Sequence, residues 1–190
     1  MTVKPTAFID RDGTINIDGG YINHPGNFEI YPFAAQALRM LNTADWLVVI
    51  ITNQSGIGRG FYTIDIMEEI HAKMNRHFAA QGVKIDAIYY CPHDPHSKIE
   101  EYRKDCDCRK PNTGMFEQAI RELPVDKENM VVIGDKYSDM EAGFKIGAKT
   151  VMVKTGYGLG EFRLKSRQWR RQPDRSAENL LEAVRIVIGL

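Results

Sequence analysis

The stretch that decides the fold is Ala7-Phe8-Ile9-Asp10-Arg11-Asp12-Gly13-Thr14-Ile15-Asn16, in which an apolar run ends abruptly in carboxylates, a glycine and a threonine. The apolar run is typical of a buried β-strand that delivers functional groups at its end. Side chains two positions apart on an extended segment point to the same side, so Asp10 and Asp12 can face one small volume. Gly13 then lets the chain leave the strand sharply.

Two less specific structures share this pattern. An Asp-rich turn after a strand is common, so this motif taken alone could be a plain turn without a functional role. A calcium-binding EF-hand loop requires glycine at its sixth position, and counting from Asp10 or from Asp12 places Ile15 or Ile17 there. The EF-hand is therefore excluded. The choice between a plain turn and a functional site depends on the residues at the ends of the other strands.

The composition is that of an ordinary globular protein, because 43% of the 190 residues are hydrophobic and 26% are charged. This length predicts one domain, residues 1–190. Lys and Arg together number 25, as do Asp and Glu, so no net charge attracts the chain to nucleic acid or to an anionic membrane. The first residues lack the apolar core of a signal peptide, and no apolar run reaches the roughly 18 residues of a membrane-spanning helix. We expect a cytoplasmic protein, and a monomer.

Strand and helix patterns alternate along the chain. A continuous apolar, β-branched run predicts a strand over 46–51, and further strands are expected over 85–90, 130–133 and 150–153. Apolar stripes and capping residues predict helices over 32–43, 63–81, 115–123, 138–146 and 177–188. This order predicts an α/β fold, a Rossmann-like parallel sheet with helices on both faces. We expect residues 156–175 to be the least regular part.

Polar side chains follow three of the expected strands, and a fourth polar set opens an expected helix. These sets are Asp10 with Asp12, Thr52 with Asn53, Asp135 with Lys136, and Arg109 with Lys110. In open α/β sheets, ligands bind outside the carboxyl ends of the strands, where all four sets would meet. Carboxylates and cations gathered at one place suit phosphoryl transfer, which needs positioning and charge neutralisation.

The residue types at this edge indicate a division of roles. Asp10 would attack phosphorus and form an aspartyl-phosphate. Asp12 would protonate the leaving oxygen and later activate water. Asp10 and Asp135 would hold Mg²⁺, which prefers carboxylate and phosphate oxygens. Lys110 and the Thr52 hydroxyl would bind and neutralise the equatorial phosphoryl oxygens.

The ordered set DRDGT, TNQSG, RKP and GDKYSD resembles the haloacid dehalogenase superfamily of phosphohydrolases. The resemblance implies that Mg²⁺ is bound by the side chains of Asp10 and Asp135 and by the backbone carbonyl of Asp12, with Lys136 and Asp139 close by. Asp139 could equally be a charge at a helix N-terminus, so we leave it out of the predicted site. The chain has no room for the inserted domain that many members carry, which predicts a capless, open site.

A second cluster of metal-ligand residues lies between the third strand and the next helix. It consists of Cys91, His93, Cys106 and Cys108, and it includes every cysteine of the chain. Three thiolates and an imidazole suit a closed tetrahedral Zn²⁺ site with a structural role, in a loop insertion over 91–108. The alternative is a set of free cysteines with a chance histidine, since His96 is also near.

A narrower resemblance is carried by YCPH, CDCRKP and TNQSGIGRG, which resemble the sugar bisphosphate phosphatases of this superfamily. It implies that the protein removes one phosphate from a phosphorylated sugar; the alternative is histidinol phosphate as the substrate. The residues implied to contact the substrate are Asp18, Gly19, Gly20, Tyr21, Thr52, Asn53, Gln54, Ser55, Arg109, Lys110 and Lys136. Among them, Thr52 to Ser55 would hold the reacting phosphate and Arg109 would recognise the sugar side.

The segment 163–175 departs from that resemblance because it is strongly basic. It carries Arg163, Lys165, Arg167, Arg170, Arg171 and Arg175 around Trp169. A nucleic-acid binding module built on this tryptophan is the alternative of another class. The zero net charge and the lack of an RNP, KH or paired zinc-finger pattern argue against it, so we do not expect nucleic acid as a partner. Gly156-Tyr-Gly158-Leu-Gly160 lacks the helix and third-glycine spacing of a dinucleotide-binding loop.

Overall fold

The computed structural model describes residues 2–189, which form alternating strands and helices. The strands are β1 (Lys4–Ile9), β2 (Leu47–Asn53), β3 (Ala87–Cys91), β4 (Val125–Gly134), β5 (Lys149–Val153) and β6 (Arg175–Ala177). The α-helices are α1 (Ala34–Thr43), α2 (Ile64–Ala79), α3 (Gly114–Glu122), α4 (Tyr137–Lys145), α5 (Gly158–Lys165) and α6 (Leu180–Ile188). Short 3₁₀ turns lie at Pro25–Asn27, Glu100–Tyr102 and Ser166–Gln168.

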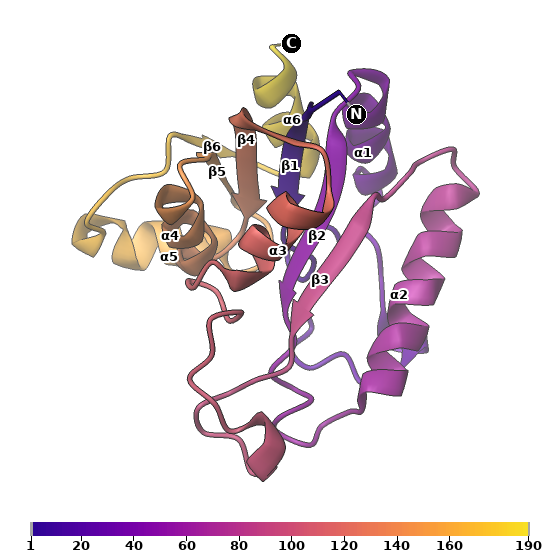
Figure 1. Ribbon diagram of the computed structural model, residues 1–190, viewed down its shortest axis with the longest axis vertical. Coiled ribbons are helices and arrows are strands. Elements are labelled where there is room, and N and C mark those ends of the chain that lie inside the picture. The colour runs from indigo at the N-terminus through magenta and orange to yellow at the C-terminus, as the bar shows by residue number, and fades with distance from the viewer. Residues whose placement is uncertain (1, 190) are drawn as a thin grey trace.

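The strands form one six-stranded sheet in the order β3-β2-β1-β4-β5-β6, and every pairing is parallel. β1 therefore lies inside the sheet, between β2 and β4 (Figure 1). This confirms the predicted α/β fold. The carboxyl ends of the strands point to one edge of the sheet, and both chain termini lie toward the opposite edge (Figure 1).

The two faces of the sheet pack against different helices. In β1, Ala7 and Ile9 belong to a hydrophobic cluster shared with α1, α2 and α6, whereas Phe8 belongs to a second cluster shared with α3 and α4. This alternation follows from the two-residue period of a strand. Phe8 meets Phe116 of α3 edge to face, with ring centroids 5.3 Å apart. Burial on both faces explains why the central strands are continuous apolar runs.

The structure is more regular near the C-terminus than the sequence predicts. Residues 158–165 form α5, although Gly158 and Gly160 weaken the helical pattern. Residues 175–177 form β6, a short edge strand that pairs with β5. β4 begins at Val125 rather than at 130, because buried Val125 already pairs with Lys4 of β1; residues 127–129 are exposed and lie in an irregularity before Met130 pairs with Thr6. A helix thus begins at Gly158, within the glycines at 156–160, but their spacing still differs from a dinucleotide-binding loop.

The basic segment 163–175 is tied to the fold through Trp169. The indole ring stacks on Tyr137 at the start of α4, with centroids 4.6 Å apart and planes 5° apart, and Phe162 meets it edge-on. Arg171 lies over the Phe144 ring and forms an ion pair with Asp174. Because the tryptophan is used in packing, the arrangement does not favour a base-stacking platform for nucleic acid.

The long connection between β3 and α3 extends beyond the carboxyl edge of the sheet (Figure 1). It holds the predicted loop 91–108, and its only regular element is the 3₁₀ turn Glu100–Tyr102. Before it, the chain from Thr14 to Thr52 contributes one 3₁₀ turn, α1 and β2. Within residues 2–189, no helix has both the length and the apolar character needed to cross a bilayer.

Candidate active site

Asp10 follows the last residue of β1, at the carboxyl edge of the sheet. Its backbone N–H donates to the Ile133 carbonyl of β4 at 2.9 Å, which fixes where the side chain leaves the sheet. The side chain is almost fully buried, and Oδ1 accepts a hydrogen bond from Lys110 Nζ at 2.6 Å. Burial raises the pKa of Asp10 to about 6, with Lys110 partly opposing the rise. Such a carboxylate, poorly solvated and held beside a cation, is suited to act as a nucleophile.

Lys110 is the buried cation of the site. Its ammonium donates to Asp10, to the Ile51 carbonyl at 2.8 Å and to Asp139 Oδ1 at 2.6 Å, so all three N–H bonds have acceptors. Burial works to lower the pKa of Lys110, but the two carboxylates raise it above its ordinary value, which keeps the amine charged. Asn53 fixes the backbone here, because its amide accepts from Lys110 N and donates to Lys110 O.

Asp135 at the end of β4 completes a group of three buried carboxylates with Asp10 and Asp139. One oxygen from each lies within 4.8 Å of the others. Asp135 Oδ2 accepts from the Tyr157 backbone N–H at 2.8 Å, whereas the buried Oδ1 has no hydrogen-bond partner among the described residues. Burial and the neighbouring Asp10 raise the pKa of Asp135 well above its ordinary value. A buried, unpaired oxygen beside two more carboxylates fits a divalent cation with oxygen ligands.

Two glycines allow Asp135 to sit this close to the loops around it. A Cβ added to Gly13 or to Gly156 would lie 2.3 Å from Asp135 Oδ2. Both also have positive φ angles, +88° and +56°, which other residues rarely adopt. The glycine of the opening motif therefore does more than turn the chain, since it leaves space for a carboxylate of another strand.

Asp139 belongs to this site although the sequence analysis left it out. Its Oδ1 pairs with Lys110, and its Oδ2 accepts from the Lys136 backbone N–H at 3.0 Å, which caps α4. The residue therefore caps a helix N-terminus, as one of the alternatives held, and lines the candidate active site at the same time. Sequence reasoning could have weighed its place one helical turn after Asp135, but the contact with Lys110 depends on the tertiary structure.

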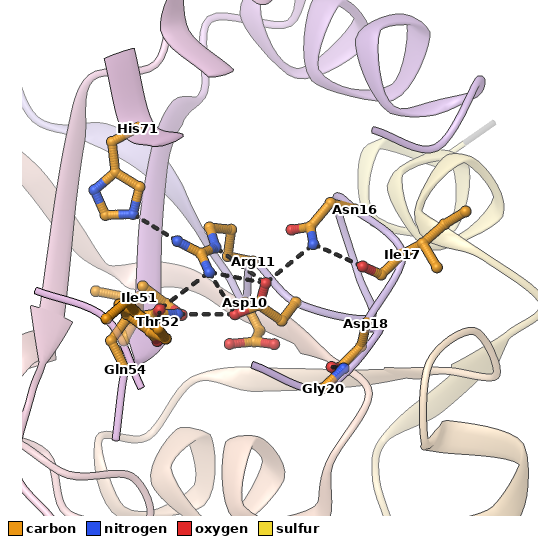
Figure 2. A network of polar contacts seen from close by, with 12 residues as sticks. Asp10, Arg11, Asn16, Ile17, Asp18, Gly20, Ile51, Thr52, Gln54 and His71 are labelled. Carbon is orange, nitrogen blue, oxygen red and sulfur yellow. Dashed lines mark hydrogen bonds and ion pairs between the residues drawn. The ribbon is translucent and has the colours of Figure 1, made fainter. Parts of the chain in front are cut away.

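Asp12 lines the same cavity as Asp10, as predicted, but its carboxylate has different partners. It accepts hydrogen bonds from Arg11, Asn16 and Gln54 at 2.8–3.1 Å. Figure 2 shows these three side chains converging, with His71 on the side of Arg11 that lies away from Asn16. Burial would raise the pKa of Asp12, but Arg11 and the hydrogen bonds from Asn16 and Gln54 bring it below its ordinary value.

A cavity of about 230 Å³ opens over these groups. Ten predicted site residues line it: Asp10, Asp12, Asp18, Gly20, Tyr21, Thr52, Asn53, Ser55, Lys110 and Lys136. Five further residues that were not predicted from the sequence also line it: Gly56, Tyr62, Ser138, Asp139 and Tyr157. Predicted residues from separate parts of the chain therefore meet at one cavity.

Three predicted substrate contacts do not line this cavity: Gly19, Gln54 and Arg109. Gly19 is exposed. The Gln54 side chain is buried, and its amide binds protein groups instead of facing the cavity. Arg109 is half-buried, and its guanidinium donates to the His93 carbonyl at 3.1 Å. The positions of these three residues in the sequence predict that they lie near the site. They do not predict where each side chain points, because that depends on the conformation of the loop that carries it.

Lys136 is the second cation of the cavity. Its ammonium lies 3.3 Å from Asp18 Oδ2 and 4.6 Å from the centre of the Tyr157 ring. Burial works to lower the pKa of Lys136, but Asp135, Asp10 and Asp18 raise it above its ordinary value. The site thus holds two cations beside its carboxylates, and these two lysines are the lining groups that can attract an incoming phosphate dianion.

The four predicted zinc-ligand residues come together at the end of β3, which supplies Cys91, and in the long connection after it, which supplies the other three. Sγ of Cys108 lies 2.9 Å from Sγ of Cys91, 3.1 Å from Sγ of Cys106 and 3.2 Å from Nδ1 of His93. These sulfur–sulfur distances are too long for a disulfide. The hydrogen bond between Cys91 and Cys108 lowers the pKa of Cys108 to about 5, so one thiolate is available as a ligand. Four ligand atoms converging without a disulfide fit a tetrahedral metal site.

The loop around this cluster contacts the loop that follows β2. Arg59 pairs with buried Asp94 at 2.7 Å, and the Ser97 hydroxyl donates to the Gly58 carbonyl. Because Ser55 and Gly56 on the same loop line the cavity, the cysteine cluster and the cavity are joined by a short path of contacts.

Comparisons with known proteins show which family the chain resembles. Residues 107–183 match a family model described as HAD-hydrolase-like. The chain is 40% identical to the D-glycero-beta-D-manno-heptose-1,7-bisphosphate 7-phosphatase of Pasteurella multocida, with 99% of each chain covered, and 46% identical to that of Haemophilus influenzae, with 81% and 84% covered. A crystal structure of D,D-heptose 1,7-bisphosphate phosphatase from B. bronchiseptica, complexed with magnesium and phosphate, superposes with a TM-score of 0.85 at 33% identity, covering 97% and 98%.

Proposed function

Because this chain belongs to the heptose bisphosphate phosphatases of the haloacid dehalogenase superfamily, we propose that it removes the C7 phosphate of D-glycero-D-manno-heptose 1,7-bisphosphate. The reaction class, hydrolysis of a phosphate ester, follows from the family. The observation that carries the mechanism is the position of Asp10, a buried carboxylate at the cavity floor, held by Lys110 and adjacent to Asp135.

The first step is attack by Asp10 on phosphorus. The bond between phosphorus and the sugar oxygen breaks, and that oxygen takes its proton from Asp12. A bound phosphoryl group brings negative charge beside Asp12, which raises the low pKa of this carboxyl and so favours its protonated form. Lys110, which would exchange one of its three acceptors for a phosphoryl oxygen, and the Thr52 hydroxyl would bind the phosphoryl oxygens while charge shifts between them.

The second step is hydrolysis of the aspartyl-phosphate. Asp12, now a carboxylate, accepts a proton from water as the water oxygen attacks phosphorus, and the bond to Asp10 breaks. Asp10 and Asp135 would hold Mg²⁺, together with the predicted backbone carbonyl of Asp12. When bound, this ion neutralises charge on the phosphoryl oxygens and on the carboxylates around them.

A panel of phosphate esters tests the assignment directly. Purified protein with Mg²⁺ should release one phosphate from the heptose bisphosphate, leave the monophosphate, and act little on histidinol phosphate. ³¹P NMR of the product shows which phosphate has left. A preference for histidinol phosphate would make the protein a histidinol-phosphate phosphatase, and turnover of neither substrate would contradict both assignments.

Arg109 should contribute to binding of the second phosphate. Its half-buried guanidinium lies next to Lys110 in the chain and is held by the His93 carbonyl, and a guanidinium can bind a phosphate through two donors. We expect Arg109→Ala to raise KM for the bisphosphate by about tenfold, the loss of one charged hydrogen bond. The rate on a small ester such as 4-nitrophenyl phosphate should change little, because the contact is remote from the reacting phosphorus.

Lys104→Ala is the matched control for Arg109→Ala, since it removes an exposed cation from the same loop. Steady-state kinetics on both substrates separate the outcomes. Equal losses on the two substrates would place Arg109 in the catalytic group, and an unchanged KM for the bisphosphate would remove it from the substrate site.

We also propose that Cys91, His93, Cys106 and Cys108 bind one structural Zn²⁺. Purified protein should contain about one zinc per chain, measured by elemental analysis. His93→Asn should lose the zinc and lower the melting temperature, because ligand binding and folding of the loop are coupled. His96→Asn is the control, since His96 is a neighbour outside the cluster and should change neither quantity. Full zinc occupancy in His93→Asn, or no zinc in the parent, would contradict the proposal.

Some expectations from the sequence stay predictions. They are a single domain, a capless site, a monomeric state and a cytoplasmic location. They concern the domain organisation, the access to the site, the assembly and the location of the protein. The chemistry proposed for Asp10 and Asp12 depends on none of them.

A further inference from the structure

We propose that Arg11, Gln54 and His71 form a positioning network that holds the Asp12 carboxylate for proton transfer. This inference rests on the proposed phosphatase mechanism, because it assigns these residues a role that acts through Asp12. None of the three lines the cavity, and all three are buried. They converge from the end of β1, from the loop after β2 and from α2 (Figure 2).

Arg11 is the centre of the network. Its guanidinium is 1% exposed and donates to both oxygens of Asp12, from Nε at 3.1 Å and from Nη2 at 2.8 and 2.9 Å. A planar fork facing a carboxylate fixes the plane of that carboxylate as well as its position. The guanidinium carbon also lies over the Phe28 ring, 5.6 Å from the ring centroid, so this ring covers one face of the guanidinium.

Gln54 binds Asp12 from a second direction. Its Nε2 donates to Asp12 Oδ2 and to the Thr52 hydroxyl, each at 2.8 Å. Its Oε1 accepts from Arg11 Nη2 at 3.1 Å and from the Tyr62 hydroxyl at 2.6 Å. The orientation of the amide is fixed, because a carboxylate can only accept and a guanidinium can only donate. Gln54 thus ties Asp12 to Thr52, two groups that act on the same phosphoryl group.

His71 links the network to α2. Its Nε2 lies 3.0 Å from Arg11 Nη1, and since the guanidinium cannot accept, the histidine must be the acceptor. Burial and the nearby Arg11 lower the pKa of His71 to about 3, so the ring is neutral and keeps its accepting nitrogen. His71 therefore fixes the guanidinium at the end opposite to Asp12.

These contacts point to positioning, because they all converge on one side chain that faces the cavity. Both oxygens of Asp12 are held, yet 16% of its side chain stays exposed. A carboxylate fixed in this way is directed at the leaving oxygen in the first step and at water in the second. If it were free to rotate, both proton transfers would slow, since a displacement of about 1 Å can cost as much as a hundredfold in rate.

The test compares two phosphate esters that differ in whether the leaving oxygen must receive a proton from Asp12. A sugar phosphate requires a proton on its leaving oxygen, whereas 4-nitrophenolate leaves without one. A misplaced Asp12 therefore slows both steps with the sugar substrate, but chiefly hydrolysis of the aspartyl-phosphate with 4-nitrophenyl phosphate. We expect His71→Leu, which removes the acceptor, to lower kcat on the heptose bisphosphate by about tenfold or more.

Rapid-quench kinetics with 4-nitrophenyl phosphate give the distinguishing readout. His71→Leu should release a burst of nitrophenol close to one equivalent per chain and accumulate acid-stable phosphoprotein, followed by slow turnover. His71→Gln restores an accepting oxygen and should recover most of the parent's rate. Gln54→Met should also show the burst, and it tests the network should His71→Leu fail to fold. His77→Leu replaces an exposed histidine on the same helix and should behave as the parent.

The outcomes separate the network from the proposed function. A burst in His71→Leu or Gln54→Met, with recovery in His71→Gln, supports positioning. Equal slowing on both esters without a burst overturns the positioning role, because a variant that is merely less folded would lose the same share of its rate on both substrates. Variants that match the parent overturn it as well. A parent protein that hydrolyses neither ester would instead overturn the phosphatase mechanism, and the network's role with it.

Discussion

Asp10→Asn should abolish phosphatase activity, with a fall in kcat of roughly four orders of magnitude or more, the scale seen when a covalent nucleophile is removed. An amide is a far poorer nucleophile than a carboxylate and a weaker ligand for Mg²⁺. The fold should survive, because asparagine keeps the size of the side chain and an oxygen for Lys110. Lys110 also retains Asp139 and the Ile51 carbonyl.

The melting temperature of Asp10→Asn shows whether the loss of activity comes from catalysis or from unfolding. Burial raises the pKa of Asp10, which means that the folded protein disfavours its charged form, so the neutral amide should not lower the melting temperature. Asp65→Asn, a change in the first turn of α2 away from the cavity, should leave both activity and stability near those of the parent. Turnover by Asp10→Asn close to the parent level would mean that another group attacks phosphorus.

Lys110→Met should destabilise the metal-free protein by about 3–5 kcal/mol, the usual cost of breaking a buried ion pair by removing one partner. The change leaves Asp10 and Asp139 buried without their shared cation, and only Lys136 remains as a cation of the cavity. Activity should fall as well, because Lys110 would bind the phosphoryl oxygens. Urea unfolding with EDTA measures the stability, and phosphate release measures the activity.

Added Mg²⁺ provides an internal check on Lys110→Met. If a cation between the carboxylates is what the variant lacks, Mg²⁺ should raise its melting temperature more than it raises that of the parent. Lys145→Met is the matched control, because this exposed lysine donates to the neighbouring Pro111 carbonyl and should be nearly neutral. A Lys110→Met protein as stable as the parent without metal would show that the carboxylates do not need this cation.

The fold could be predicted wherever a strand is buried on both faces. β1, β2, β4 and β5 appear in the sequence as apolar runs because both of their sides meet helices. α5 and β6 could not be predicted in this way. α5 contains two glycines and buries only Gly158, and β6 has three residues whose strand conformation comes from pairing with β5. Neither has an apolar stripe to reveal it.

The sequence predicts those site residues whose positions follow from the course of the backbone alone. Asp10, Thr52 and Lys136 lie at or just beyond strand ends, and parallel strands bring their ends to one edge whatever the side chains do. The bonding of Gln54 could not be predicted, because its side chain turns toward Arg11 and away from the cavity. His71 gave no signal of its own, since a histidine on a helix that packs against the core is most often a packing residue.

The place of β1 between β2 and β4 has a consequence for how the chain reaches its folded state. Pairing with β2 joins Thr6 to Leu47, but pairing with β4 joins Thr6 to Met130, so one edge of β1 is completed only by a partner far along the chain. Closing so long a loop before its contacts form slows folding. During synthesis, β1 therefore keeps the backbone N–H and C=O groups of one edge unpaired until β4 has been made, and the rate of translation sets the interval in which that edge can associate with other chains.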